Sequence, residues 1–215
     1  MGPAPTGGTE HCSSNLSGTA GALSWTIWSS GTGGCITTYG TDAFSATWDS
    51  SGDFLARAGL QWNSTQTYTE LGTITAQFAE SKTGTASPFS YIGIYGWSED
   101  PTIEYYIVDD SYSAMPVNPG NTASKGTAVI DGGTYNLYTR PASGSSIDGA
   151  TSWTQFYSIR QTARQCGQIS ITEHFDAWAA AGMVLGNMEE AKVLVEAGGG
   201  SGSIVFPTAI VTATE

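Results

Sequence analysis

Short runs of alternating apolar and polar residues recur along the chain. Residues 44–48, 91–95, 134–138 and 155–160 all alternate in this way, and clusters of Gly, Ser and Asp separate them. The side chains of a strand point alternately to its two faces, so such runs are typical of strands with one buried face. The pattern predicts an all-β domain, either an antiparallel sandwich or a barrel.

Residues 172–182 are the exception, because their apolar residues have helical spacing. Phe175 and Trp178 lie three positions apart on one face, and Gly182 is a typical residue for the end of a helix. We expect one short helix there, packed on the back of a sheet. His174 lies within it and is expected to be a packing residue, because no Ser or Cys nucleophile motif accompanies it.

The composition limits the class of partner. The chain has 215 residues, a net charge of −12, only 12% charged residues, seven Trp and ten Tyr. This length suits a single domain over residues 1–215, with residues 1–12 and 207–215 expected to be loosely attached. The negative charge argues against nucleic acid and against an anionic membrane surface. A monomer that meets a neutral, hydroxyl-rich substrate with aromatic rings is the better interpretation.

The cysteines allow at most one intramolecular disulfide. Cys12, Cys35 and Cys166 are far apart in the sequence, and the pairing stays open. Their spacing resembles no metal site, and neither a metal nor a cofactor is expected. Two glycosylation triplets, at residues 15–17 and 63–65, are compatible with a secreted, extracellular protein, although such triplets are also common by chance.

Two glutamates are the main candidates for chemistry. Strand parity places Glu104 on the same face as Tyr106, and Glu196 on the same face as Glu190 and Lys192. A pair of carboxyl groups across a cleft is the minimum needed to hydrolyse a glycosidic bond. Parity alone fits equally well with two glutamates on an ordinary solvated face. A third run presents aromatic residues on one face, namely Tyr91, Tyr95 and Trp97.

Five collinear segments resemble a known family. The most specific is residues 95–108, Tyr-Gly-Trp-Ser-Glu-Asp-Pro-Thr-Ile-Glu-Tyr-Tyr-Ile-Val. The others are residues 47–54, 155–160, 174–178 with 182–186, and 195–196 with 201–203. Together they resemble the glycoside hydrolase family 11 endo-β-1,4-xylanases over residues 23–206. The resemblance implies a β-jelly roll of two curved antiparallel sheets with one short α-helix, and a deep cleft covered by a hairpin called the thumb.

The resemblance also implies roles for three carboxyl groups. Glu104 would be the nucleophile and Glu196 the general acid/base of a retaining double displacement on xylan. Such a reaction needs the two carboxyls about 5–5.5 Å apart. Asp53 would hydrogen-bond to Glu196 and accompany an acidic pH optimum. The alternative for Asp53 is a simple turn residue after Ser-Ser-Gly.

The same resemblance assigns six residues to substrate binding. They are Trp28 as a stacking platform for a distal xylose, Tyr91 as a cleft tyrosine, Tyr95 and Tyr106 beside the nucleophile or the sugar, Gln155 reaching toward the nucleophile, and Ile147 in the thumb tip. Aromatic faces suit the C–H face of a pyranose, and phenol hydroxyls supply directional hydrogen bonds. Each of these residues could instead be ordinary filling of a sheet.

Several positions depart from the family pattern. Glu190 stands where a substrate-binding tyrosine is expected, residues 197–198 replace a Gly-Tyr pair, and the thumb tip at 145–148 reads Ser-Ser-Ile-Asp. Arg57, Lys192 and Glu190 together would favour a substituted or acidic xylan. Two alternatives therefore stay open: a hydrolase of the same fold with an altered substrate, and a catalytically weakened relative that binds polysaccharide or a partner protein.

Overall fold

The computed structural model describes residues 5–50, 52–116 and 119–214, which form two large, mainly antiparallel sheets. The smaller sheet has six strands, in the spatial order β1 (Thr9–Ser13), β4 (Gly34–Thr38), β5 (Phe44–Ser50), β15 (Gly200–Thr214), β7 (Thr73–Ala86) and β13 (Cys166–Ile169). The larger has nine strands, in the order β10 (Ala123–Ile130), β11 (Gly133–Ser143), β12 (Ser152–Arg160), β9 (Ile103–Asp110), β8 (Ser90–Glu99), β14 (Asn187–Ala197), β6 (Phe54–Gln61), β3 (Leu23–Ser29) and β2 (Asn15–Ala20). The all-β prediction is confirmed.

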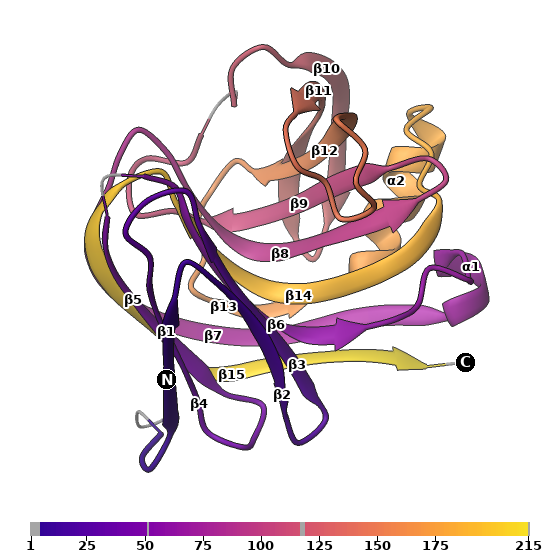
Figure 1. The fold of residues 1–215 in the computed structure, drawn as a ribbon. Coiled ribbons are helices and arrows are strands. Elements are labelled where there is room, and N and C mark those ends of the chain that lie inside the picture. The colour runs from indigo at the N-terminus through magenta and orange to yellow at the C-terminus, as the bar shows by residue number, and fades with distance from the viewer. Residues whose placement is uncertain (1–4, 51, 117–118, 215) are drawn as a thin grey trace.

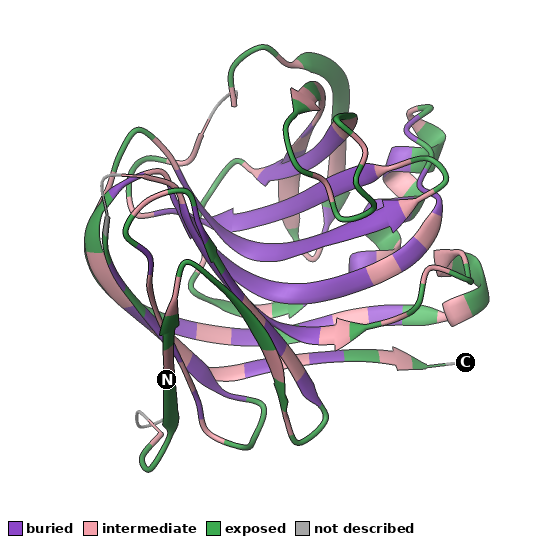
Figure 2. Ribbon diagram, viewed as in Figure 1, coloured by how far each residue is buried: buried purple, intermediate pink, exposed green. Residues whose placement is uncertain are grey.

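The main hydrophobic core draws on both sheets. Ile92 and Ile94 of β8 and Ile107 of β9 belong to it, whereas Tyr95 and Tyr106 belong to a second cluster on the opposite face of the same strands. This division confirms the faces predicted from strand parity. Figure 2 shows that buried residues run along β8, β9 and β14, at the centre of the nine-stranded sheet.

The nine-stranded sheet is curved, and the hairpin that joins β11 to β12 stands over it (Figure 1). A register shift between Ile92 and Gly93 interrupts the pairing of β8 with β9. A Cβ at Gly93 would lie 2.0 Å from the carbonyl oxygen of Ile107, so only glycine allows the two strands to approach here. The end of this hairpin, residues 143–152, is the predicted thumb.

Helix α2 (Ile171–Ala180) is the helix predicted from the sequence. Phe175 and Trp178 are fully buried, and both rings contact Tyr105. His174 is buried edge-on against Tyr135, with ring centroids 4.5 Å apart, and burial lowers its pKa to about 3. His174 therefore packs in the protein interior, as expected, and is not among the residues that line the cleft.

A second helix was not predicted. Helix α1 (Tyr68–Leu71) is a single turn, begun by a capping box in which Glu70 accepts a hydrogen bond from the backbone N–H of Thr67. Four residues are too few to show a helical period in the sequence. Within the described part of the chain, neither helix is long and apolar enough to cross a membrane.

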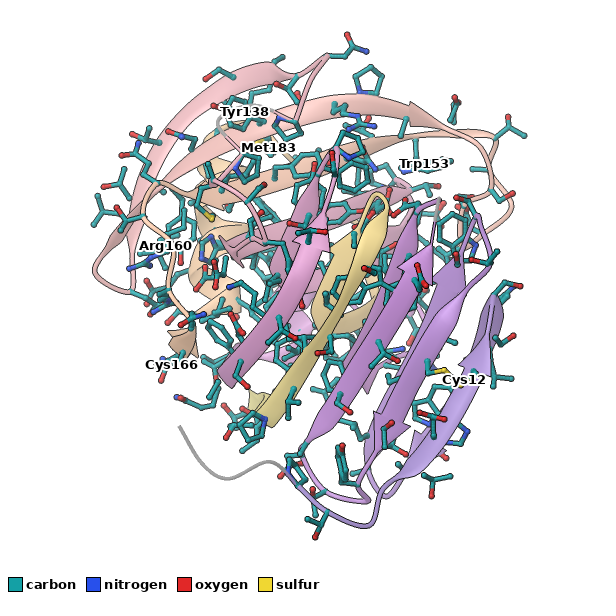
Figure 3. All side chains as sticks on the ribbon, turned by 90° about the vertical axis from the view of Figure 1, so that its left-hand side faces the viewer. Cys12, Tyr138, Trp153, Arg160, Cys166 and Met183 are labelled. Atoms are coloured by element: carbon teal, nitrogen blue, oxygen red, sulfur yellow. A yellow bond between two sulfur atoms is a disulfide. The ribbon has the colours of Figure 1, made fainter. Side chains whose placement is uncertain are left out.

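Cys12 and Cys35 form a disulfide between β1 and β4, where they lie directly opposite each other. Cys166 is a free, exposed thiol in β13, far from Cys12 (Figure 3). The structure thus decides the pairing that the sequence left open. In the loop-entropy model, a crosslink over a sequence separation of 23 residues stabilises the fold by about 3 kcal/mol.

The predicted loose attachment of the chain ends is wrong for most of the residues concerned. Residues 208–214 continue β15 and pair with β7, and residues 9–12 belong to β1. Val211 faces the core, but the adjacent Ile210 is apolar too, and the other residues of this segment are Thr and Ala, so the alternation of a strand is hidden. Residues 1–4 and 215 lie outside the described residues.

Candidate active site

A cleft of about 590 Å³ lies between the nine-stranded sheet and the thumb. It is lined by side chains from β3, β6, β8, β9, β12 and β14, and by residues 143–147 of the thumb. The structure brings all nine predicted site residues into this cleft, and their individual roles stay predictions. They are Trp28, Asp53, Tyr91, Tyr95, Glu104, Tyr106, Ile147, Gln155 and Glu196.

Glu104 is held by four hydrogen-bond donors. The hydroxyls of Tyr95 and Tyr106 donate to its Oε1, at 2.8 and 2.9 Å. The indole of Trp153 and the amide of Gln155 donate to its Oε2, at 2.8 and 2.6 Å. An ionised carboxylate only accepts hydrogen bonds, so this arrangement satisfies both oxygens and fixes the orientation of the group.

Further contacts hold these donors in place. The indole of Trp97 donates to the hydroxyl of Tyr95 at 2.7 Å, and the hydroxyl of Tyr157 donates to the side-chain oxygen of Gln155 at 3.0 Å. The guanidinium of Arg57 lies 4.7 Å from the centre of the Tyr95 ring. Glu104 is therefore set in a rigid network rather than in free solvent.

Glu196 has very different surroundings. It is buried on β14, and its carboxyl lies within hydrogen-bonding reach of Asp53. One oxygen of each group, Oε2 of Glu196 and Oδ1 of Asp53, is buried with no donor among the described residues. A proton held between the two carboxyls would satisfy this need.

Electrostatics favour a proton at this pair. Burial raises the pKa of Asp53 to about 6, and the negative charge of Glu104 adds to the effect. The pKa of Glu196 lies well above its usual range, because burial and the charges of Asp53 and Glu104 all disfavour the anion. The hydroxyl of Tyr106, which donates to Glu104, lowers the pKa of Glu196, but by less than burial raises it. The cleft thus sets a carboxyl pair whose surroundings favour a proton opposite a carboxyl group held by four donors, which is the division of roles that acid/base catalysis requires.

Sequence reasoning missed several residues of the cleft. Trp153 and Tyr157 share a face of β12 with Gln155, and the parity rule applied to that strand would have found both. Arg140 lies directly opposite Gln155 in the β11–β12 pairing. Trp153 lies near the thumb end of β12 (Figure 3).

Glu190, which strand parity places on the same face as Glu196, does not present a third carboxylate to the cleft. It is only 2% exposed and is not among the residues that line the cleft. Its two oxygens are bound by Arg57 and Lys192, each at 2.8 Å. Burial works against ionisation, yet the two positive charges lower the pKa of Glu190. Arg57 lines the cleft in its place.

The thumb tip is tied down by Asp148. This carboxylate accepts hydrogen bonds from the hydroxyl of Ser146 at 2.6 Å, from the backbone N–H of Ala150 at 3.0 Å, and from the hydroxyl of Thr102. These donors lower the pKa of Asp148 to about 2. Thr102 precedes β9, so the contact connects the thumb that carries Ile147 to the strand that carries Glu104.

Residues 20–206 match the family model described as Glycosyl hydrolases family 11. The chain belongs to this family. It is 43% identical over 190 residues to "Endo-1,4-beta-xylanase S20" of Neocallimastix patriciarum, covering 86% of this chain and 57% of that protein. It is also 43% identical over 193 residues to "Endo-1,4-beta-xylanase C" of Fibrobacter succinogenes, covering 88% of this chain and 32% of that protein.

The fold agrees with this membership. The crystal structure of wild-type ENZbleach xylanase superimposes with a TM-score of 0.92 at 34% identity, covering 99% of this chain and 90% of that one. The predicted family and the predicted jelly roll are therefore confirmed. The chain spans between about a third and three fifths of the length of the two curated relatives named above.

The pKa of Asp53 predicts how stability depends on pH. Its pKa of about 6 in the folded protein lies above the ordinary value of 3.8, so stability is lost as the pH rises from about 4 to 6. The loss amounts to about 3 kcal/mol by the usual conversion. Asp53→Asn removes it, and should raise the melting temperature by about 5–10 °C at pH 7.5 but by much less at pH 4. Asp49→Asn, at an exposed position, is the control. An equal change in melting temperature at both pH values would show that the pKa of Asp53 is not raised in the folded protein.

Proposed function

We propose that this chain is a secreted endo-1,4-β-xylanase, active as a monomer, that cleaves xylan with retention of configuration. The observation that carries the proposal is the contrast between Glu104, which four donors hold as an anion, and Glu196, which shares a buried site with Asp53. Membership of the family and the printed names of the relatives support the choice of xylan. The Cys12–Cys35 disulfide is consistent with an oxidising compartment.

In the first step, an oxygen of Glu104 attacks the anomeric carbon of a xylose unit. The bond from that carbon to the leaving oxygen breaks, and Glu196 gives its proton to this oxygen. The products are a shortened xylan chain and a sugar bound to Glu104 as an ester. The network around Glu104 aligns the attacking oxygen before the sugar arrives.

In the second step, the change in charge reverses the role of Glu196. Glu104 is uncharged as an ester, so its contribution to the raised pKa of Glu196 disappears. Glu196, now ionised, takes a proton from water as the water oxygen attacks the anomeric carbon. Glu104 leaves as a carboxylate. Two displacements at one carbon restore the original configuration.

The walls of the cleft suit an uncharged sugar chain. Trp28, Tyr91, Trp97 and Trp153 present aromatic rings to the cleft. Trp28 is 41% exposed, which is unusual for so large an apolar ring and fits a platform for a sugar. The carboxylate of Glu190 was one of the features that favoured a weakened or redirected cleft. It is buried between Arg57 and Lys192, so it no longer supports that alternative.

Activity should require Glu104 and Glu196. Unmutated protein is expected to release reducing sugar from beechwood xylan between pH 3 and 6. Glu196→Gln should lose at least about a hundredfold in kcat with natural xylan, since a positioned acid contributes 10²–10⁴, and Glu104→Gln should lose at least as much. Proton NMR of the first product should show the β anomer. Failure of the unmutated chain to cleave any xylan would rule out the proposal, and an initial α anomer would rule out retention.

The acidic optimum should depend on Asp53. Above about pH 6 Asp53 ionises, and its negative charge makes Glu196 hold its proton more tightly, so Glu196 is a weaker acid and activity should fall. An amide at this position donates a hydrogen bond to Glu196 at every pH, so Asp53→Asn should move the alkaline limb of the kcat/KM profile to higher pH. A full profile from pH 3 to 9 with both proteins measures this shift. Superimposable alkaline limbs would exclude Asp53 from setting the optimum.

A further inference from the structure

Arg57 is a buried cation whose donors are only partly used by the protein. It reaches the cleft from β6 and is only 9% exposed. Its Nε–H donates to Glu190 at 2.8 Å, and its guanidinium lies over the ring of Tyr95. Among the described residues, no protein acceptor binds either of its terminal amino groups. Buried guanidinium groups normally use these donors, and Arg57 lines the cleft, so an acceptor on a ligand in the cleft is the expected partner.

The position of Arg57 relative to the reacting carboxylate is well defined. In the sheet, β6 lies between β14 and β3, and Arg57 is directly opposite Thr26 of β3. Trp28 lies two residues further along β3. On the other side, Tyr95 contacts Arg57 and donates to Glu104. A sugar chain that extends from Glu104 to the Trp28 platform would pass over Arg57.

The charges around Arg57 indicate which chemical group it binds. Glu190 already neutralises the guanidinium at contact distance, and the charge of Glu104 also acts on it. A carboxylate on the substrate would therefore stand near two further carboxylates, and like charges at short range repel. Neutral hydroxyl groups accept hydrogen bonds from a guanidinium without this cost.

We propose that Arg57 is a sugar-binding residue whose terminal amino groups donate to the hydroxyls of an uncharged pyranose between Glu104 and Trp28. The inference rests on the proposed function and adds a determinant of substrate choice to it. Lys192 has a supporting part, since its ammonium binds the second oxygen of Glu190 and is itself fully buried. Glu190 holds the guanidinium in place through its Oε1, Lys192 binds only the other oxygen of Glu190, and Arg57 alone touches the sugar.

Lys192 supplies a matched control, because it contributes the other half of the Glu190 ion pair without lining the cleft. Binding of linear xylotetraose can be measured by calorimetry on a Glu196→Gln background. Arg57→Met should weaken binding about tenfold, as expected for lost hydrogen bonds to a charged donor. Lys192→Met should change it less than twofold. In the active chain, Arg57→Met should raise KM for linear xylan and leave kcat within about twofold.

Equal weakening by the two variants would overturn the proposal, because it would assign Arg57 a purely structural part. A larger loss of affinity for glucuronic-acid-substituted xylo-oligosaccharides than for linear ones would also overturn it, in favour of a carboxylate site. Should Arg57→Met fail to fold, Arg57→Lys retains the charge beside Glu190 but lacks the forked donors, and should show the same loss of binding. An inactive unmutated chain whose xylotetraose binding still depends on Arg57 would refute the proposed catalysis and support this inference.

Discussion

Two carboxyl groups that act as a pair in a buried cleft cannot both be ionised at short range without a large cost. In this protein, the surroundings of each group decide which one keeps the charge. Glu104 receives hydrogen bonds at both oxygens from four side chains, so its anion is well solvated by the protein. Glu196 and Asp53 lie against each other, each with one buried oxygen that has no donor among the described residues, and burial raises the pKa of both. The proposed mechanism depends on this difference.

The curved sheet is what makes this contrast possible. On β8 and β9, alternate residues fill the apolar core and the aromatic face of the cleft, so the donors to Glu104 are anchored by the same packing that stabilises the fold. A second group of buried charges lies beside the cleft, and its members neutralise one another. Arg57, Glu190 and Lys192 form a compact set of ion pairs in which both oxygens of the carboxylate are bound. Such a set tolerates burial because no member is left unpaired.

The fold and the residues of the cleft could be predicted from the sequence for two reasons. Side chains alternate with a period of two along a strand, and five segments occur in the same order as in the family 11 xylanases. The same alternation, applied to the strand that carries Gln155, would also have predicted Trp153 and Tyr157. The pairing of Glu190 with Arg57 could not be predicted in this way, since the two residues are 133 positions apart and are not opposite each other in the sheet. Arg57 lies opposite Leu194 in the β14–β6 register, and only its long side chain reaches Glu190. The end of β15 was missed because its small Thr and Ala residues show little contrast between faces.

The central claim is that Glu104 forms a covalent bond to the sugar while Glu196 moves the proton. Incubation with an activated 2-deoxy-2-fluoro-β-xylobioside slows the second step, so that the sugar ester accumulates and can be located by peptide mass spectrometry. We expect one added disaccharide, on Glu104, with Asp53 and Glu196 unmodified. A sugar attached to Glu196, or no adduct from a preparation that does hydrolyse xylan, would contradict it.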